Sequence, residues 1–170
     1  MDINDSRAIP LVWPLLFSSI AGIASSKMSF QSRVSLSLLL LRLTIALVFF
    51  MWTLQKFLYP EQASNVYEMF FFVPSLVPTL VQVIAVLETI LLVAFVTGFK
   101  KHITYWVIVA CHSLSTGAAL LKYFEPFRGP NLLFFAAWPM LAACFTLAML
   151  QRWDTWLTLR SVTKAFTVRD

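Results

Sequence analysis

VSLSLLLLRLTIALVFFMWTLQKFL, residues 34–58, is an almost unbroken apolar run and decides the fold class of this chain. A helix needs about 20 apolar residues to cross a bilayer, and this run is long enough. Arg33 precedes the run and the pair Tyr59-Pro60 follows it. Because the residue before a proline is pushed out of the helical region, the helix is expected to end there. We therefore predict a membrane-spanning helix that carries one charge, Arg42, in its interior.

Three further apolar runs extend this pattern along the chain, at Ser75–Phe99, Ile103–Leu121 and Leu132–Leu150. Hydrophobic residues make up 59% of the 170 residues and charged residues 12%, against roughly 25% charged in ordinary globular domains. The sequence predicts an all-α integral membrane four-helix bundle whose short connections make neighbouring helices antiparallel. A short amphipathic helix is expected on the outer surface over Pro60–Val73, between the first two spans.

The expected organisation has three parts: an N-terminal cytoplasmic or interfacial extension at 1–33, the four-span membrane domain at 34–150, and an amphipathic cytoplasmic tail at 151–170. Residues 9–26 leave three interpretations open, namely a fifth span, an interfacial helix and a cleaved signal. Pro10 and Pro14 disfavour a regular helix. Two acids in the first residues disfavour a signal peptide, whose start is positively charged. An interfacial segment fits best.

The basic residues predict the orientation of the spans. The chain has 13 Lys and Arg against 8 Asp and Glu. In a four-span arrangement one side receives Lys27, Arg33, Lys100, Lys101, Arg152, Arg160, Lys164 and Arg169, and the other side receives Lys56, Lys122 and Arg128. Cytoplasmic loops are rich in Lys and Arg, so both termini are expected in the cytoplasm. Membrane topology accounts for the excess of positive charge, and no nucleic-acid partner is expected.

Three ionisable residues lie deep inside separate apolar runs: Arg42, Glu88 and His112. An arginine in the bilayer centre costs about 2.5–3.5 kcal/mol on insertion scales, so such groups need partners. Counted from the cytoplasmic ends, they lie at depths of roughly 12, 16 and 14 Å respectively, at 1.5 Å per residue. The similar depths predict one interior polar site in which Glu88 pairs with Arg42 and His112 bonds to either. Replacing Glu88 with glutamine should then leave Arg42 without its counter-charge.

A second polar layer is expected nearer the outside, formed by Lys56, Gln82 and Asn131. Lys56 follows Arg42 by nearly four helical turns, so both should point to the same face. This outer vestibule would lead towards the inner site. Two simpler interpretations stand beside it: the Arg42–Glu88 pair is only a structural clamp, and Lys56 extends to the membrane interface.

No catalytic residue and no metal site can be assigned from the sequence. The two cysteines stand alone, without the spacing of a metal site or a disulfide framework. His102 and His112 lie on or beside the same run, which does not suit a haem held between two helices. The chain alone is expected to bind no cofactor, and a redox centre would come from a partner or substrate.

The segment Leu41–Glu61, LRLTIALVFFMWTLQKFLYPE, resembles the first span of the DoxX-like integral membrane protein family. The likeness continues through Val73–Gly98, where a glutamate interrupts an apolar run that ends in glycine, and covers residues 34–150. The resemblance implies a bacterial inner-membrane protein in which Arg42, Lys56 and Glu88 match the polar positions of the family. The chain departs from the family pattern where Thr44, Thr89 and Ile90 replace glycine-rich stretches, and in its long N-terminal extension.

Members of such families are linked to redox work, including thiosulfate:quinone oxidation. The resemblance therefore implies a membrane subunit or anchor of a quinone-linked or respiratory redox system, an accessory rather than a self-sufficient enzyme. Its expected partners are membrane lipid and another membrane or peripheral redox protein, and its candidate ligand is a quinone. Two alternatives stay open: a small proton-coupled membrane transporter, and a non-catalytic assembly factor of a membrane complex.

Overall fold

The computed structural model describes residues 28–73 and 77–159. Within these ranges the chain forms helices and no strand, which confirms the all-α prediction. The elements are α2 (Phe30–Leu58), α3 (Pro60–Phe71), α4 (Pro78–Val96), α5 (Lys101–Ala118), α6 (Leu120–Tyr123), the 3-10 helix η1 (Gly129–Ala136) and α7 (Ala137–Met149). Contacts divide the chain into two units, Met1–Val34 and Ser35–Asp170. The three interpretations of residues 9–26 concern residues outside the described ranges.

Three stretches of helix are long and apolar enough to cross a membrane: α2, α4, and the continuous stretch Gly129–Met149 formed by η1 and α7. The run predicted as a third span does form a helix, α5, but that helix is not among the three. Its lower hydropathy follows from a lysine, two histidines and several hydroxyl residues in KHITYWVIVACHSLSTGA. The chain thus has the features of a helical membrane protein, with three rather than four clear candidate spans among the described residues.

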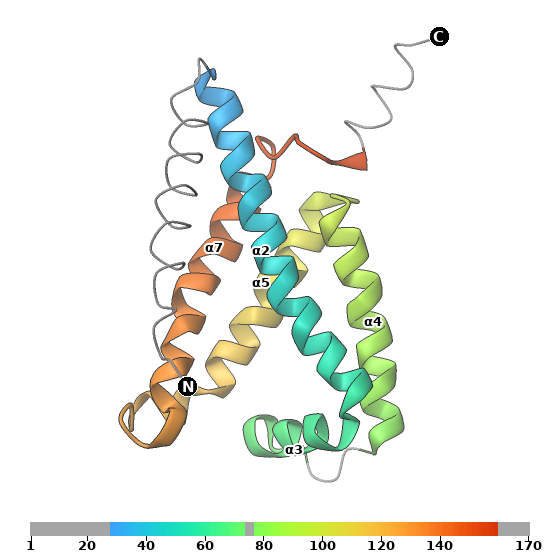
Figure 1. Cartoon of the computed structure of the whole chain (residues 1–170), viewed down its shortest axis with the longest axis vertical. Coiled ribbons are helices and arrows are strands. Elements are labelled where there is room, and N and C mark those ends of the chain that lie inside the picture. Colours follow the sequence, from blue (N-terminus) through green and yellow to red (C-terminus); the bar gives the residue numbers. More distant parts are fainter. Residues whose placement is uncertain (1–27, 74–76, 160–170) are drawn as a thin grey trace, which may run out of the picture. The chain divides into compact units, whose positions relative to one another are not determined.

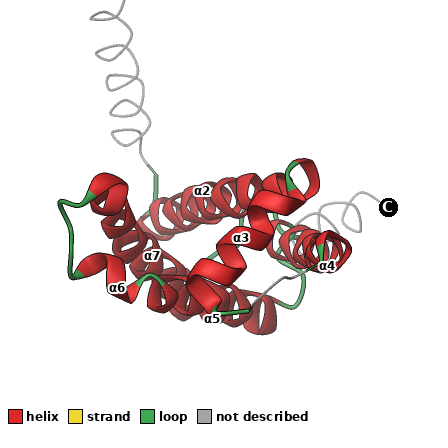
Figure 2. Cartoon of the chain, turned by 90° about the horizontal axis from the view of Figure 1, so that it is seen from below, coloured by secondary structure: helices red, strands yellow, loops and turns green. Residues whose placement is uncertain are grey.

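Prolines fix the starts of two helices. Pro60 and Pro78 lie in the first turns of α3 and α4 respectively. A proline is suited to this place because its fixed φ is helical and the missing N–H has no partner in the first turn. The predicted short helix between the first two apolar helices is therefore confirmed as α3. Figure 2 shows α3 lying across one end of the helical unit.

The unit Ser35–Asp170 has two chemically different ends. The end called here the basic end carries the α4–α5 turn with Lys100 and Lys101, and the segment 150–159 with Arg152 (Figure 1). The opposite end carries α3 and the connection from α6 to η1. Between the two ends α5 lies against α7 and also contacts α4. The apolar core includes Leu38, Ile45, Val81, Ala85, Phe95, Ile108 and Leu147.

Residues 151–159, the start of the predicted cytoplasmic tail, fold onto the basic end. The backbone N–H of Leu159 donates to the carbonyl of Thr97 at 2.9 Å. The hydroxyl of Ser35 donates to the carbonyl of Trp153 at 2.6 Å. Asp154 is fully buried and Thr158 is 3% exposed. These contacts hold the segment because its polar groups find partners on α2 and at the end of α4; residues 160–170 lie outside the described ranges.

Gly98 makes the tight turn that brings α4 and α5 together. Its φ is +66°, and the N–H groups of Gly98 and Phe99 donate to the carbonyls of Phe95 and Ala94 at 3.1 and 2.8 Å. This is the hydrogen-bond pattern of a Schellman motif, in which glycine accepts the left-handed conformation without strain. A Cβ at Gly98 would lie 3.1 Å from the Cγ2 of Thr158.

Replacing Gly98 with alanine is therefore expected to lower the free energy of unfolding by about 1–2 kcal/mol, the usual cost of a left-handed residue with a Cβ. Gly117 is the matched control, because it is helical and a Cβ there meets nothing within 4 Å. Gly117→Ala should stabilise the protein by about 0.5–1 kcal/mol. Reversible unfolding in mixed detergent micelles measures both variants, and equal stability of the two would contradict the left-handed conformation of Gly98.

Candidate functional site

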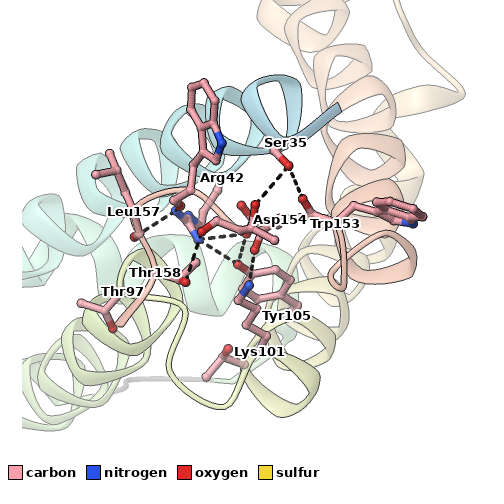
Figure 3. Close-up of polar contacts among 12 residues, drawn as sticks. Ser35, Arg42, Thr97, Lys101, Tyr105, Trp153, Asp154, Leu157 and Thr158 are labelled. Atoms are coloured by element: carbon pink, nitrogen blue, oxygen red, sulfur yellow. Dashed lines mark hydrogen bonds and ion pairs between the residues drawn. The ribbon is translucent and has the colours of Figure 1, made fainter. Parts of the chain in front are cut away.

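Two charged side chains in the described part of the chain are completely buried, and one of them is Arg42, on α2. It is fully buried, and its two terminal nitrogens have four acceptors (Figure 3). Nη1 donates to Oδ2 of Asp154 at 2.9 Å and to the hydroxyl oxygen of Tyr105 at 3.3 Å. Nη2 donates to the carbonyls of Trp156 and Leu157 at 2.6 and 3.2 Å. We call Ser35, Arg42, Lys101, Tyr105 and Asp154 the Arg42 network.

Asp154 is the centre of this network. Its carboxylate forms a salt bridge with Arg42 in which both side chains are completely buried, and it accepts a hydrogen bond from the hydroxyl of Tyr105. The ammonium of Lys101 donates to the backbone carbonyl of Asp154. Side chains of α2 and α5 thus bind the segment 150–159 together. The Arg42 network is therefore a clamp that holds the segment 150–159 against α2 and α5 at the basic end.

The predicted pair of Arg42 and Glu88 does not form, and the directions of the helices explain why. Side chains on a helix tilt towards its N-terminus. Since α2 runs away from the basic end, this tilt directs Arg42 towards that end, where it reaches Asp154. Since α4 runs towards the basic end (Figure 1), the same tilt directs Glu88 away from it. The two charged groups therefore lie apart, although a count along the sequence gives their backbones similar depths.

Glu88 pairs instead with the residue expected in the outer vestibule, Lys56. The ammonium of Lys56 lies 2.8 Å from Oε2 of Glu88, and the hydroxyl of Thr53 donates to the same oxygen at 3.1 Å. The side chains of Lys56 and Glu88 are 14% and 30% exposed. We call Thr53, Lys56, Tyr67 and Glu88 the Glu88 cluster, because α3 adds Tyr67 from the opposite end.

The raised pKa of the Tyr67 phenol gives a testable prediction. Burial of its phenol raises the pKa of Tyr67 from 10.0 to about 12, with further contributions from the charge of Glu88 and from Cys111. Because the folded state favours the neutral phenol, this stabilisation is present below pH 10 and is lost as the pH rises through about 12. Among the four tyrosines, an absorbance titration should show a step near pH 12 that is lost in Tyr67→Phe, while Tyr105, whose pKa is also raised by burial, still titrates late. A Tyr67→Phe titration identical to wild type would contradict this environment.

His112 bonds neither to Arg42 nor to Glu88, which corrects the expected inner site. It is 1% exposed, and its Nε2 lies 3.1 Å from the carbonyl oxygen of Ala137. Its ring is stacked on Trp52 at 6.0 Å between centroids and meets Phe49 edge-on at 6.1 Å. The imidazole therefore links α5 to the start of α7 in an aromatic environment.

The expected outer vestibule of Lys56, Gln82 and Asn131 is not assembled either. Gln82 is exposed on α4. Asn131 is 6% exposed, and its side-chain amide donates to the carbonyl of Glu125 at 2.9 Å, which closes the turn before η1. Among residues 28–73 and 77–159 no hydrogen bond joins these three side chains. Lys56 extends towards Glu88 because α2 tilts its side chains towards the basic end.

Sequence reasoning missed the partners Thr53, Tyr67, Tyr105 and Asp154. A signal for Asp154 was present, since it is a single acid between Trp153 and Trp156 directly after an apolar run. In the described part of the chain no group of three or more His, Cys, Asp or Glu could hold a metal ion. No protein family matches the chain, and no curated protein or solved structure matches it either.

Proposed function

We propose that this chain is a multi-pass inner-membrane protein that acts as a subunit or anchor of a quinone-linked redox system. The observation that carries the proposal is the Arg42 network, in which one buried guanidinium binds four acceptors of its own chain. A charge held this way fixes helices and a terminal segment in place. Such a role is that of a scaffold rather than of a group that takes part in chemistry.

Two further features support the proposal. The helices α2 and α4 expose large apolar side chains, which fit lipid or the membrane helices of a partner; these include Leu43, Leu47, Leu87, Ile90 and Val93. The redox link rests on the resemblance of Leu41–Glu61 to the DoxX-like family, in which Arg42, Lys56 and Glu88 match the polar positions. With Lys100, Lys101 and Arg152 at the basic end, we propose that this end faces the cytoplasm.

Membranes from cells that lack the protein provide the test. The rate of quinone reduction by these membranes should be lower than in membranes that contain the protein, and adding back wild-type protein should restore the rate. Asp154→Leu, which removes the carboxylate of the Arg42 network, should restore it poorly. Glu125→Gln is the matched control, since Glu125 forms an exposed ion pair with Arg128, and it should restore the rate fully. Unchanged quinone reduction without the protein, together with no redox protein co-purifying in mild detergent, would rule out the proposal.

The Glu88 cluster favours a second candidate, a small proton-coupled transporter. Glu88 is a carboxylate inside an apolar helix, its side chain is 30% exposed, and its partner is the cation Lys56. Protonation of Glu88 would weaken that contact and could open the cluster. In liposomes with an imposed pH gradient, wild type and Glu125→Gln should carry protons, and Glu88→Gln should not. Equal gradients in empty and loaded liposomes would eliminate this candidate.

A further inference from the structure

His112 carries a hydrogen-bond acceptor that no residue of the described chain satisfies. The side chain is 1% exposed, and Nδ1 has no hydrogen-bond partner while Nε2 faces the carbonyl of Ala137. A buried polar atom without a partner has lost its hydrogen bonds to water and has gained none in return. The ring is therefore held at an energetic disadvantage that a suitable ligand atom would remove.

The contact with Ala137 fixes the chemistry of the free atom. A carbonyl oxygen only accepts hydrogen bonds, so Nε2 must carry the proton and donate it. A second proton on Nδ1 would create a buried cation with no anion beside it, since the carboxylates of Asp154 and Glu88 already pair with Arg42 and Lys56. Nδ1 consequently presents a lone pair. Its partner must be a hydrogen-bond donor.

The surroundings define the rest of such a partner. Phe49 and Trp52 of α2 pack on the His112 ring, and we call these three residues the His112 cluster. Aromatic neighbours favour an apolar or aromatic ligand and disfavour a charged donor such as an ammonium group. Trp52 is 39% exposed, so the His112 cluster extends to the surface of the helical unit at this ring. A molecule dissolved in lipid would first meet the cluster at Trp52.

We propose that the His112 cluster binds the hydroxyl group of a neutral, ring-bearing amphiphile that enters from the membrane. The hydroxyl donates to Nδ1 of His112, and the ring of the ligand packs against Phe49 and Trp52. This inference requires the membrane assignment of the proposed function. It is independent of any redox partner and of the Glu88 cluster.

The test uses the full chain in lipid nanodiscs, labelled with nitrogen-15 at histidine only. Its two histidines give a small set of signals, and His102→Gln assigns them. Addition of para-hexylphenol should move the Nδ1 signal of His112 upfield, as acceptance of a hydrogen bond requires. The methyl ether of the same phenol has no donor and should leave that signal in place. Equal shifts with both compounds, or a signal already at the bonded position before addition, would overturn the proposal.

Affinity gives a second measurement. His112→Phe keeps a flat ring and removes the acceptor, so para-hexylphenol should bind about five- to tenfold more weakly than to wild type, the value of one hydrogen bond. His102→Gln alters the other, exposed histidine and should bind the phenol as wild type does. Equal affinity of His112→Phe and wild type would overturn the proposal. Loss of quinone-linked activity in cells, tested separately, decides the proposed function and not this inference.

Discussion

Asp154→Leu is expected to lower the free energy of unfolding by about 3–5 kcal/mol, because Arg42 would keep a buried positive charge without a carboxylate. Both side chains of this pair are 0% exposed, so water cannot take the place of the lost partner. The remaining acceptors of Arg42 are a phenol and two backbone carbonyls, which are neutral. Reversible unfolding in mixed detergent micelles measures the effect.

The control for this variant is Glu125→Leu at the exposed pair with Arg128, where the two side chains are 57% and 80% exposed. Exposed ion pairs contribute little to stability, so this substitution should change unfolding far less than Asp154→Leu. Glu88→Gln should also leave Arg42 paired, contrary to the expectation from sequence, and should affect the contact with Lys56 instead. Similar losses at Glu125 and Asp154 would contradict the importance of the buried pair.

Arg42→Lys is expected to cost about 1.5–3 kcal/mol although the charge is kept, because a lysine lacks the planar fork that binds several acceptors at once. An ammonium that reaches Asp154 would give up the carbonyls of Trp156 and Leu157. Local loosening should follow in the segment 150–159. Hydrogen exchange should accelerate at the amide of Leu159, which is bonded to Thr97 in the folded protein.

The conservative control is Arg128→Lys, at an exposed position on the opposite end. Its hydrogen exchange in residues 150–159 should match that of wild type. If Arg42→Lys also left this exchange unchanged, the fork of contacts from Arg42 would not be what holds the segment.

Much of the helical architecture could be predicted because local signals determine it. The apolar run at 34–58 and the proline at 60 mark helix bounds through length, hydropathy and the fixed φ of proline. Predicted and observed ends of α2 coincide at Leu58, and the start differs by four residues. The third apolar run formed a helix as well, but its hydroxyl and histidine residues make it less apolar than a clear span.

The pairing of charges could not be predicted, because it depends on side-chain direction rather than on backbone depth. A count along the sequence gives Arg42 and Glu88 similar depths, yet their helices run in opposite directions and tilt the two side chains apart. Asp154 was overlooked for a different reason. It lies in a short polar segment, and burial of that segment depends on contacts with Arg42 and Ser35, which are more than a hundred residues away in the chain.

A double-mutant cycle between Arg42 and Asp154 measures most directly whether their ion pair holds the segment 150–159 on the helices. We expect Arg42→Met and Asp154→Leu each to be strongly destabilising, and the double variant to be close to wild type, with a coupling free energy of at least about 2 kcal/mol. Effects that add within about 0.5 kcal/mol would show that the two side chains do not depend on each other, and would contradict the clamp.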